Sequence, residues 1–181
     1  KTINYKFTEE IKADEKKEIL NNIEKTDKIK LKGIIKGIFI EKGKNYNFIL
    51  SYDLSENRLN LKFYSALKNE LIFNADLQNA EATYNYFINT FFSVKIGIIL
   101  KQFHYIITLF PENTRLYKTN DDYYVILDDN RNYYKYNNFT IVKKENRKYI
   151  IRYKYENNQL IAVEIIQDTK KYFIKINEVL S

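Results

Sequence analysis

The sequence has no cysteine, no methionine and no tryptophan, and it has one histidine and one proline in 181 residues. Without cysteine there is no disulfide framework and no thiol chemistry. Because His104 is the only histidine, we expect neither a histidine-based zinc site nor a catalytic triad. The chain also has no glycine-rich phosphate loop and no nucleophile elbow. These absences predict a protein that is not an enzyme and that holds no metal and no cofactor.

Two acidic pairs, Asp121 with Asp122 and Asp128 with Asp129, are the candidates for cation binding. They do not have the spacing of a calcium loop, and they stand between predicted strands, where aspartate is common in turns. We interpret them as turn residues. Two carboxylates that meet only in the fold leave no trace in a sequence, so glycosidase chemistry remains an open alternative.

The chain also lacks an apolar run of the ~18 residues that a membrane-spanning helix needs. Its formal net charge of +7 and its pI of about 9.2 would suit an anionic partner such as nucleic acid or a lipid headgroup layer. Lysine, asparagine, isoleucine and tyrosine are abundant together, however, as an AT-rich genome produces without selection for binding. The charge alone therefore does not identify a partner.

Aromatic residues are plentiful, with 17 tyrosines and 12 phenylalanines making up 16% of the chain. These residues favour half-buried strands, and apolar residues alternate with polar ones over most of the sequence. An apolar content of 45% in 181 residues is enough for a substantial core. We therefore expect one mainly β domain that spans residues 1–181.

Near the N-terminus the sequence predicts an edge strand over residues 1–7, followed by a helix. Asp14 is the predicted N-cap of this helix, which ends by Thr26. A long strand follows, with Gly33 and Gly37 on its apolar face. Glycine at two positions of one face relieves crowding or lets a sheet bend sharply.

The most informative stretch is a hairpin that begins at Arg58. Apolar and polar residues alternate from Arg58 to Tyr64 and again from Leu71 to Phe73, which predicts two half-buried strands joined by a short loop. The loop contains Leu67. An apolar side chain on a loop either folds back onto the domain or waits for an apolar partner outside it.

The period of the apolar pattern changes between residues 87 and 110. Apolar residues recur there at spacings of three and four, which predicts a helix that ends before Pro111. The period of two then returns. It predicts six further strands, over residues 123–127, 133–136, 139–143, 148–155, 159–166 and 171–176.

This order of elements predicts a mainly β fold with α structure, in which a strongly curved antiparallel sheet is closed by a helical lid. A bent sheet under a lid encloses a space, and each element supplies apolar side chains to it. The same residues could equally form a packed core, and this alternative stays open. The predicted cavity residues are Phe48, Leu50, Tyr52, Leu61, Phe63, Phe73, Ile96, Leu100, Phe103 and Ile107.

The order of elements and the loop Tyr64-Ser-Ala-Leu-Lys-Asn69 resemble the bacterial lipoprotein-localisation family, the LolA/LolB fold. The resemblance implies a half-open β barrel whose helical lid covers lipoprotein acyl chains. It is closest to the LolB branch, the outer-membrane receptor that accepts a lipoprotein from the periplasmic carrier and inserts it. In that branch a leucine at the hairpin tip contacts the membrane, and Leu67 stands in its place. The chain lacks the proline and glycine often seen at that tip.

The resemblance also implies roles for other residues. Ala66, Leu67 and Lys68 would form the membrane-contacting loop. Arg58 stands where an arginine of the carrier branch helps to hold the lid shut. The implied partners are acylated lipoproteins, the outer-membrane lipid surface and a periplasmic carrier or inner-membrane release complex. We expect a monomer in the periplasmic space that does not bind nucleic acid.

Several alternatives remain open at this point. The chain could be a soluble LolA-like carrier, and a leader or lipid-bearing cysteine upstream of Lys1 would decide between carrier and anchored receptor. It could be an envelope interaction module with a filled core, in which Leu67 is tucked against the sheet. Nucleic-acid binding would use basic strands with interleaved tyrosines, such as residues 148–155.

Overall fold

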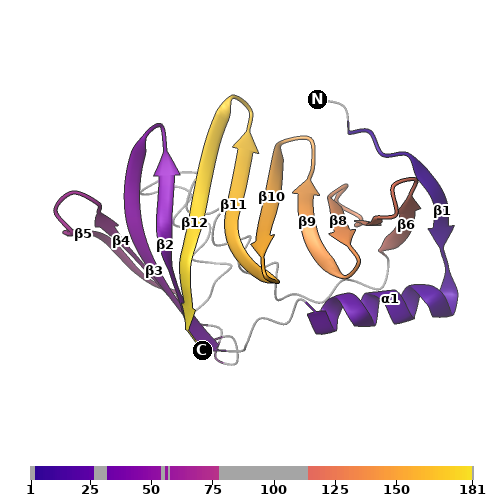
Figure 1. Ribbon diagram of the computed structural model, residues 1–181, viewed down its shortest axis with the longest axis horizontal. Coiled ribbons are helices and arrows are strands. Elements are labelled where there is room, and N and C mark those ends of the chain that lie inside the picture. Colours follow the sequence, from indigo (N-terminus) through magenta and orange to yellow (C-terminus); the bar gives the residue numbers. More distant parts are fainter. Residues whose placement is uncertain (1–2, 27–31, 54–55, 57, 78–113, 181) are drawn as a thin grey trace. The chain divides into compact units, whose positions relative to one another are not determined.

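The computed structural model describes residues 3–26, 32–53, 56, 58–77 and 114–180. Within these residues the protein is mainly β structure with one helix (Figure 1). The strands form a 12-stranded sheet in the order β1-β6-β7-β8-β9-β10-β11-β12-β2-β3-β4-β5. The elements are β1 (Phe7–Ile11), α1 (Ala13–Thr26), β2 (Lys32–Glu41), β3 (Lys44–Asp53), β4 (Arg58–Ser65), β5 (Leu71–Leu77), β6 (Arg115–Thr119), β7 (Tyr124–Leu127), β8 (Tyr133–Asn137), β9 (Thr140–Glu145), β10 (Tyr149–Glu156), β11 (Gln159–Gln167) and β12 (Lys170–Leu180).

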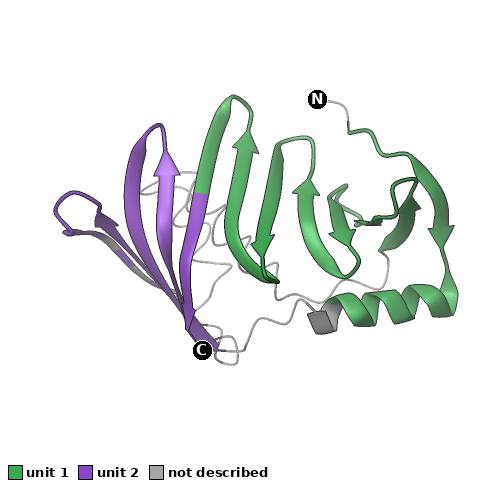
Figure 2. Cartoon of the chain, in the orientation of Figure 1, with its two compact units in different colours: residues 1–28, 109–173 green, residues 29–108, 174–181 purple. Residues whose placement is uncertain are grey.

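The chain folds into two compact units (Figure 2). Unit 1 consists of Lys1–Lys28 and Leu109–Phe173, and unit 2 consists of Ile29–Thr108 and Ile174–Ser181. Each unit combines segments that are far apart in the sequence, so neither corresponds to one contiguous part of the chain.

The helix α1 occupies the residues for which the sequence predicts a helix. Asp14 is not the N-cap, contrary to the prediction, because the helix begins at Ala13; it lies inside the first turn with Glu15, where negative charge complements the helix dipole. Ile19 and Ile23, four residues apart on one side, are buried. Within the described part of the chain, no helix is long and apolar enough to cross a membrane.

The strands of unit 1 form an antiparallel meander with one fully buried row of side chains. Seven residues stand opposite one another on seven successive strands, and each is exposed by at most 4%. Burial of this kind is the largest favourable contribution to folding. The row is Ile11, Leu116, Ile126, Tyr134, Lys144, Ile151 and Ile165.

The strands β2 to β5 of unit 2 form two consecutive hairpins that pair through β3 and β4. The β2–β3 turn has a positive φ at both Lys42 and Gly43, which is the conformation of a tight two-residue hairpin turn. Buried residues alternate with half-buried ones along β2. The buried residues are Gly33, Ile35, Gly37 and Phe39. The predicted apolar face of this strand is therefore confirmed.

Gly37 has no room for a side chain. A Cβ atom placed there would lie 2.1 Å from the carbonyl oxygen of Lys175 and 2.8 Å from the ring of Phe48. Such distances are far shorter than a van der Waals contact, so glycine is required by this close approach of two backbones.

The structure corrects one predicted strand position and adds a strand that was not predicted. The first strand is β1, Phe7–Ile11, and not residues 1–7. Strand β6, Arg115–Thr119, was not predicted, because its apolar residues Leu116 and Tyr117 are adjacent and do not alternate with polar ones. The helix predicted between residues 87 and 110, and with it the expected lid, lies outside the described residues.

Candidate functional site

The tip of the β4–β5 hairpin is held by hydrogen bonds of Ser65. The Ser65 N–H donates to the Glu70 carbonyl at 2.9 Å, and the Asn69 N–H donates to the Ser65 carbonyl at 2.8 Å. The Ser65 hydroxyl accepts a further bond from the Lys68 N–H at 3.1 Å. Asn69 adopts a positive φ of 52°, which asparagine tolerates better than most residues. The loop is therefore fixed by polar atoms.

Leu67 lies at this tip with its side chain 100% exposed. Its neighbours Ala66 and Lys68 are exposed as well. Isolated apolar residues on a surface are common, but complete exposure of a leucine gains nothing for folding because no apolar area leaves water. The alternative that Leu67 is tucked against the sheet is wrong.

A bulge at the start of β5 adds to this apolar tip. Phe63 pairs with Phe73 and Tyr64 pairs with Leu71, so Ile72 is an extra residue on its strand. A bulge changes the direction in which the side chains of a strand point. Leu71 is 53% exposed and Ile72 is 43% exposed. Three exposed apolar side chains thus lie within a few residues of one another.

Four of the predicted cavity residues come together on one face of β3 and β4. Phe48 is opposite Phe63, and Leu50 is opposite Leu61. All four side chains are exposed by at most 3%, and the rings of Phe48 and Phe63 are 6.2 Å apart. Phe39 meets Phe63 edge to face at 6.0 Å. This face is apolar and covered.

The other predicted cavity residues cannot be assigned to that face from their side chains. The backbone register places Tyr52 opposite Leu59 and Phe73 opposite Phe63, and their side chains lie outside what the structure describes. The remaining four lie in the segment 78–113, which is also outside the described residues, as is His104. These four are Ile96, Leu100, Phe103 and Ile107.

Arg58, the predicted lid-holding residue, pairs with Glu56 at 3.3 Å. Both side chains are more than half exposed, at 57% and 60%. An ion pair in water of this kind contributes little to stability. The pair leaves the Arg58 guanidinium accessible to a further partner, and the expected partner in the lid lies outside the described residues.

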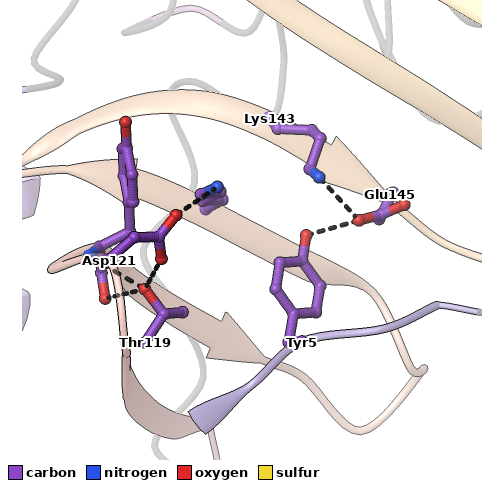
Figure 3. Close-up of polar contacts among 7 residues, drawn as sticks. Tyr5, Thr119, Asp121, Lys143 and Glu145 are labelled. Atoms are coloured by element: carbon purple, nitrogen blue, oxygen red, sulfur yellow. Dashed lines mark hydrogen bonds and ion pairs between the residues drawn. The ribbon is translucent and has the colours of Figure 1, made fainter. Parts of the chain in front are cut away.

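A second group of polar residues lies in unit 1 (Figure 3). The Tyr5 hydroxyl donates to Oε1 of Glu145 at 2.5 Å, and the Lys143 ammonium contacts the same oxygen at 3.2 Å. Burial and this hydrogen bond raise the pKa of Tyr5 well above its usual range. Because Tyr5 and Glu145 are 140 residues apart, the contact ties the N-terminal segment to β9.

Thr119 and Asp121 form another contact in Figure 3 and shape a turn. The Thr119 hydroxyl donates to the Asp121 carboxylate at 2.5 Å, and it also accepts from the Tyr123 N–H at 3.1 Å. The first of these bonds holds the pKa of Asp121 below its usual value. Asp121 is thus a turn residue, as the sequence predicts. Among the described residues no cluster of acidic or histidine side chains could hold a metal ion.

Sequence reasoning missed Lys144, a fully buried lysine in the apolar row of unit 1. Its ammonium lies 5.2 Å from the ring of Tyr134 and 5.7 Å from that of Tyr149, within reach of cation–π attraction. A bulge at Val142 moves Lys144 to this face, because Tyr136 pairs with Ile141 but Lys135 pairs with Lys143. Strict alternation from Ile141 would have placed Lys143 there instead.

No protein-family model matches the chain, and neither does any curated protein sequence.

Proposed function

We propose that the protein is a LolB-like receptor that takes up the acyl chains of lipoproteins and inserts the lipoproteins into the outer membrane. The observation that carries this proposal is the complete exposure of Leu67 on a hydrogen-bonded hairpin tip. Because the Leu67 side chain buries no apolar area in the protein, it does not stabilise the fold, and the whole side chain is available to contact lipid.

The free energies suit a transient contact. Transfer of one leucine side chain from water to lipid contributes about 1.5–3 kcal/mol. This is too little to anchor a protein of 21.9 kDa to a membrane, but it is enough to turn the hairpin tip toward the bilayer. The cargo contributes more, because each buried methylene of an acyl chain adds about 0.8 kcal/mol. The tip would therefore direct the protein to the bilayer, and the acyl chains would supply the energy of cargo binding.

We propose that the acyl chains occupy the apolar face that contains Phe48, Leu50, Leu61 and Phe63. This face is buried, so cargo can enter only if whatever covers it moves. In the proposed architecture the sheet is a half-open barrel and the segment between residues 87 and 110 is its helical lid. Opening the lid would replace contacts within the protein by contacts with acyl chains.

Transfer needs no nucleotide under this proposal. A ligand moves from a weaker site to a tighter one according to the difference in affinity, so the receptor would need only to bind cargo more tightly than a periplasmic carrier and more weakly than the bilayer. The location would be the periplasmic face of the outer membrane. A soluble LolA-like carrier remains the alternative within this class.

A module with a filled core and no ligand is the alternative from another class, and the near-complete burial of Phe48, Leu50, Leu61 and Phe63, the four predicted cavity residues whose side chains the structure describes, favours it. A fluorescent fatty-acyl probe separates the two. A lipid-binding protein would take up the probe in a saturable way, and an acylated lipoprotein would displace it. A protein with a packed core would do neither, and that result would refute the proposal.

The role of the tip is tested by Leu67→Glu in an assay of lipoprotein transfer to liposomes. We expect insertion to fall at least tenfold, because a carboxylate does not enter an apolar layer, while thermal stability and probe binding stay unchanged. Val179→Glu is the matched control, since Val179 is also an exposed apolar residue of unit 2, at 59%. Unchanged insertion by Leu67→Glu would refute the assigned role.

A further inference from the structure

The β2–β3 turn and the β4–β5 tip lie at the same end of the unit 2 sheet. Tyr46, two residues after the start of β3, pairs with Ser65, the last residue of β4. The turn at Lys42 and Gly43 precedes β3 directly, and the loop with Leu67 follows Ser65 directly. Both connections therefore project beyond the same ends of paired strands.

Exposed lysines gather at this end. Lys42, Lys44 and Lys68 are all exposed, and none of the described residues forms an ion pair with any of them. In unit 1, by contrast, several lysines pair with carboxylates. These pairs are Lys118 with Asp122, Lys135 with Asp121, Lys143 with Glu145 and Lys171 with Glu164.

The acidic residues at the same end of unit 2 are fewer. Glu41 precedes the β2–β3 turn and is half-buried, and Glu70 follows the β4–β5 tip and is exposed. Lysines thus outnumber carboxylates around an apolar tip, and the excess positive charge faces solvent. This combination is typical of surfaces that bind a lipid layer, where apolar groups enter the acyl region and cations meet the headgroups.

We infer that the two connections together form a docking surface for a bilayer that contains anionic phospholipid. Leu67, with Leu71 and Ile72 behind it, enters the boundary of the acyl region. Lys42, Lys44 and Lys68 contact the phosphate groups. The inference rests on the proposed function and adds to it a lipid preference and a second contact region, the β2–β3 turn, which carries no apolar residue.

Sedimentation with liposomes measures this lipid preference. One set of liposomes contains phosphatidylcholine alone, and the other contains in addition about 30% phosphatidylglycerol, an anionic phospholipid. We expect the unaltered protein to bind the anionic liposomes more tightly, by roughly ten- to a hundredfold at low salt, and to lose this preference as salt is added. Lys44→Gln should weaken anionic binding about fivefold, and Lys42→Gln with Lys44→Gln about twenty- to thirtyfold.

Lys32→Gln is the matched control. Lys32 is also exposed and starts β2, at the end of the hairpin opposite the turn, so the substitution removes the same charge from the other end of the sheet. We expect it to change binding by less than about twofold. An equal loss for Lys32→Gln and Lys44→Gln would overturn the inference, because the effect would then report only net charge.

Two further results would also overturn it. Equal binding of the unaltered protein to neutral and anionic liposomes is one, and self-association through Leu71 and Ile72 that competes with liposome binding is the other. The proposed function fails separately. If Leu67→Glu leaves lipoprotein insertion unchanged in liposomes of either composition, the role assigned to the tip is wrong, and if the fatty-acyl probe does not bind, the receptor role is wrong. Insertion without a lipid preference leaves both roles intact.

Discussion

One hairpin turn of unit 1 and one of unit 2 are closed by similar hydrogen bonds but differ in the side chains that they expose. In unit 1 the turn between β7 and β8 is built around Asp128, whose carboxylate accepts bonds from the Asn130 and Asn132 N–H groups, from the Asn132 amide and from the Tyr134 hydroxyl. In unit 2 the β4–β5 turn is built around Ser65 in a similar way. Both turns are thus formed by polar atoms.

The difference lies in what else the turn presents. The turn at Asp128 folds its polar side chains back onto itself, and Asn132 is only 7% exposed. The turn at Ser65 leaves Leu67 fully in water. Because Ser65, Asn69 and Glu70 already close this turn, Leu67 contributes nothing to forming it. The comparison separates residues that shape a turn from a residue that the turn merely presents.

The largest expected effect is on stability, and it distinguishes a leucine inside β4, Leu61, from the leucine at the hairpin tip, Leu67. Leu61→Ala should lower the free energy of unfolding by about 2–5 kcal/mol, since Leu61 is 0% exposed and its loss leaves a cavity. Leu67→Ala should change it by less than about 0.5 kcal/mol. Urea denaturation measures both values. A loss above about 1 kcal/mol for Leu67→Ala would mean that the tip packs against the protein after all.

The second prediction concerns the turn at Asp128. Asp128→Ala should cost about 1–3 kcal/mol, because four hydrogen bonds lose their acceptor and Asn132 is buried. Asp129→Ala removes the same charge from the exposed neighbouring residue and serves as the control. Thermal denaturation should show the difference between the two variants. Equal destabilisation would mean that charge, and not the hydrogen bonds, stabilises this turn.

The smallest effect, and the most specific, is a dependence on pH. The pKa of Tyr5 is raised above 10.0 in the folded protein, so folded Tyr5 keeps its proton at a pH where the unfolded chain loses it. The contribution of Tyr5 to stability is therefore present below about pH 10 and declines as the pH rises further. Tyr5→Phe should cost about 1 kcal/mol at pH 8 and should make the decline above pH 10 less steep.

Stability measured between pH 8 and pH 11 tests this dependence. The unaltered protein, measured over the same range, is the reference for the steepness of the alkaline decline. If Tyr5→Phe leaves it equally steep, the bond from Tyr5 to Glu145 does not hold the N-terminal segment.

Alternation in the sequence predicted most of the strands and the apolar faces of unit 2. It worked for Phe48, Leu50, Leu61 and Phe63 because β3 and β4 pair without interruption, so a period of two maps directly onto two faces. The same pattern placed Leu67 in the loop between two strands, but it left open whether the side chain packs against the sheet, and only the structure shows that it is exposed.

Alternation failed where the register shifts. The bulge at Ile72 exposes two apolar residues in succession, and the bulge at Val142 buries Lys144. A bulge depends on the partner strand, and no local pattern in the sequence marks it. The contact between Tyr5 and Glu145 was equally invisible, because it joins residues 140 positions apart.

The close approach at Gly37 also limits how the strands can slide. A shift of β2 by two residues would keep its buried and half-buried faces unchanged, so hydrophobic burial alone would tolerate it. Such a shift would bring Ile35 or Phe39 to the place where a Cβ atom meets the Lys175 carbonyl. Gly37 therefore excludes the alignments of β2 that are shifted by two residues and, through the β2–β3 turn, helps to determine how far Lys42 and Lys44 project from the sheet.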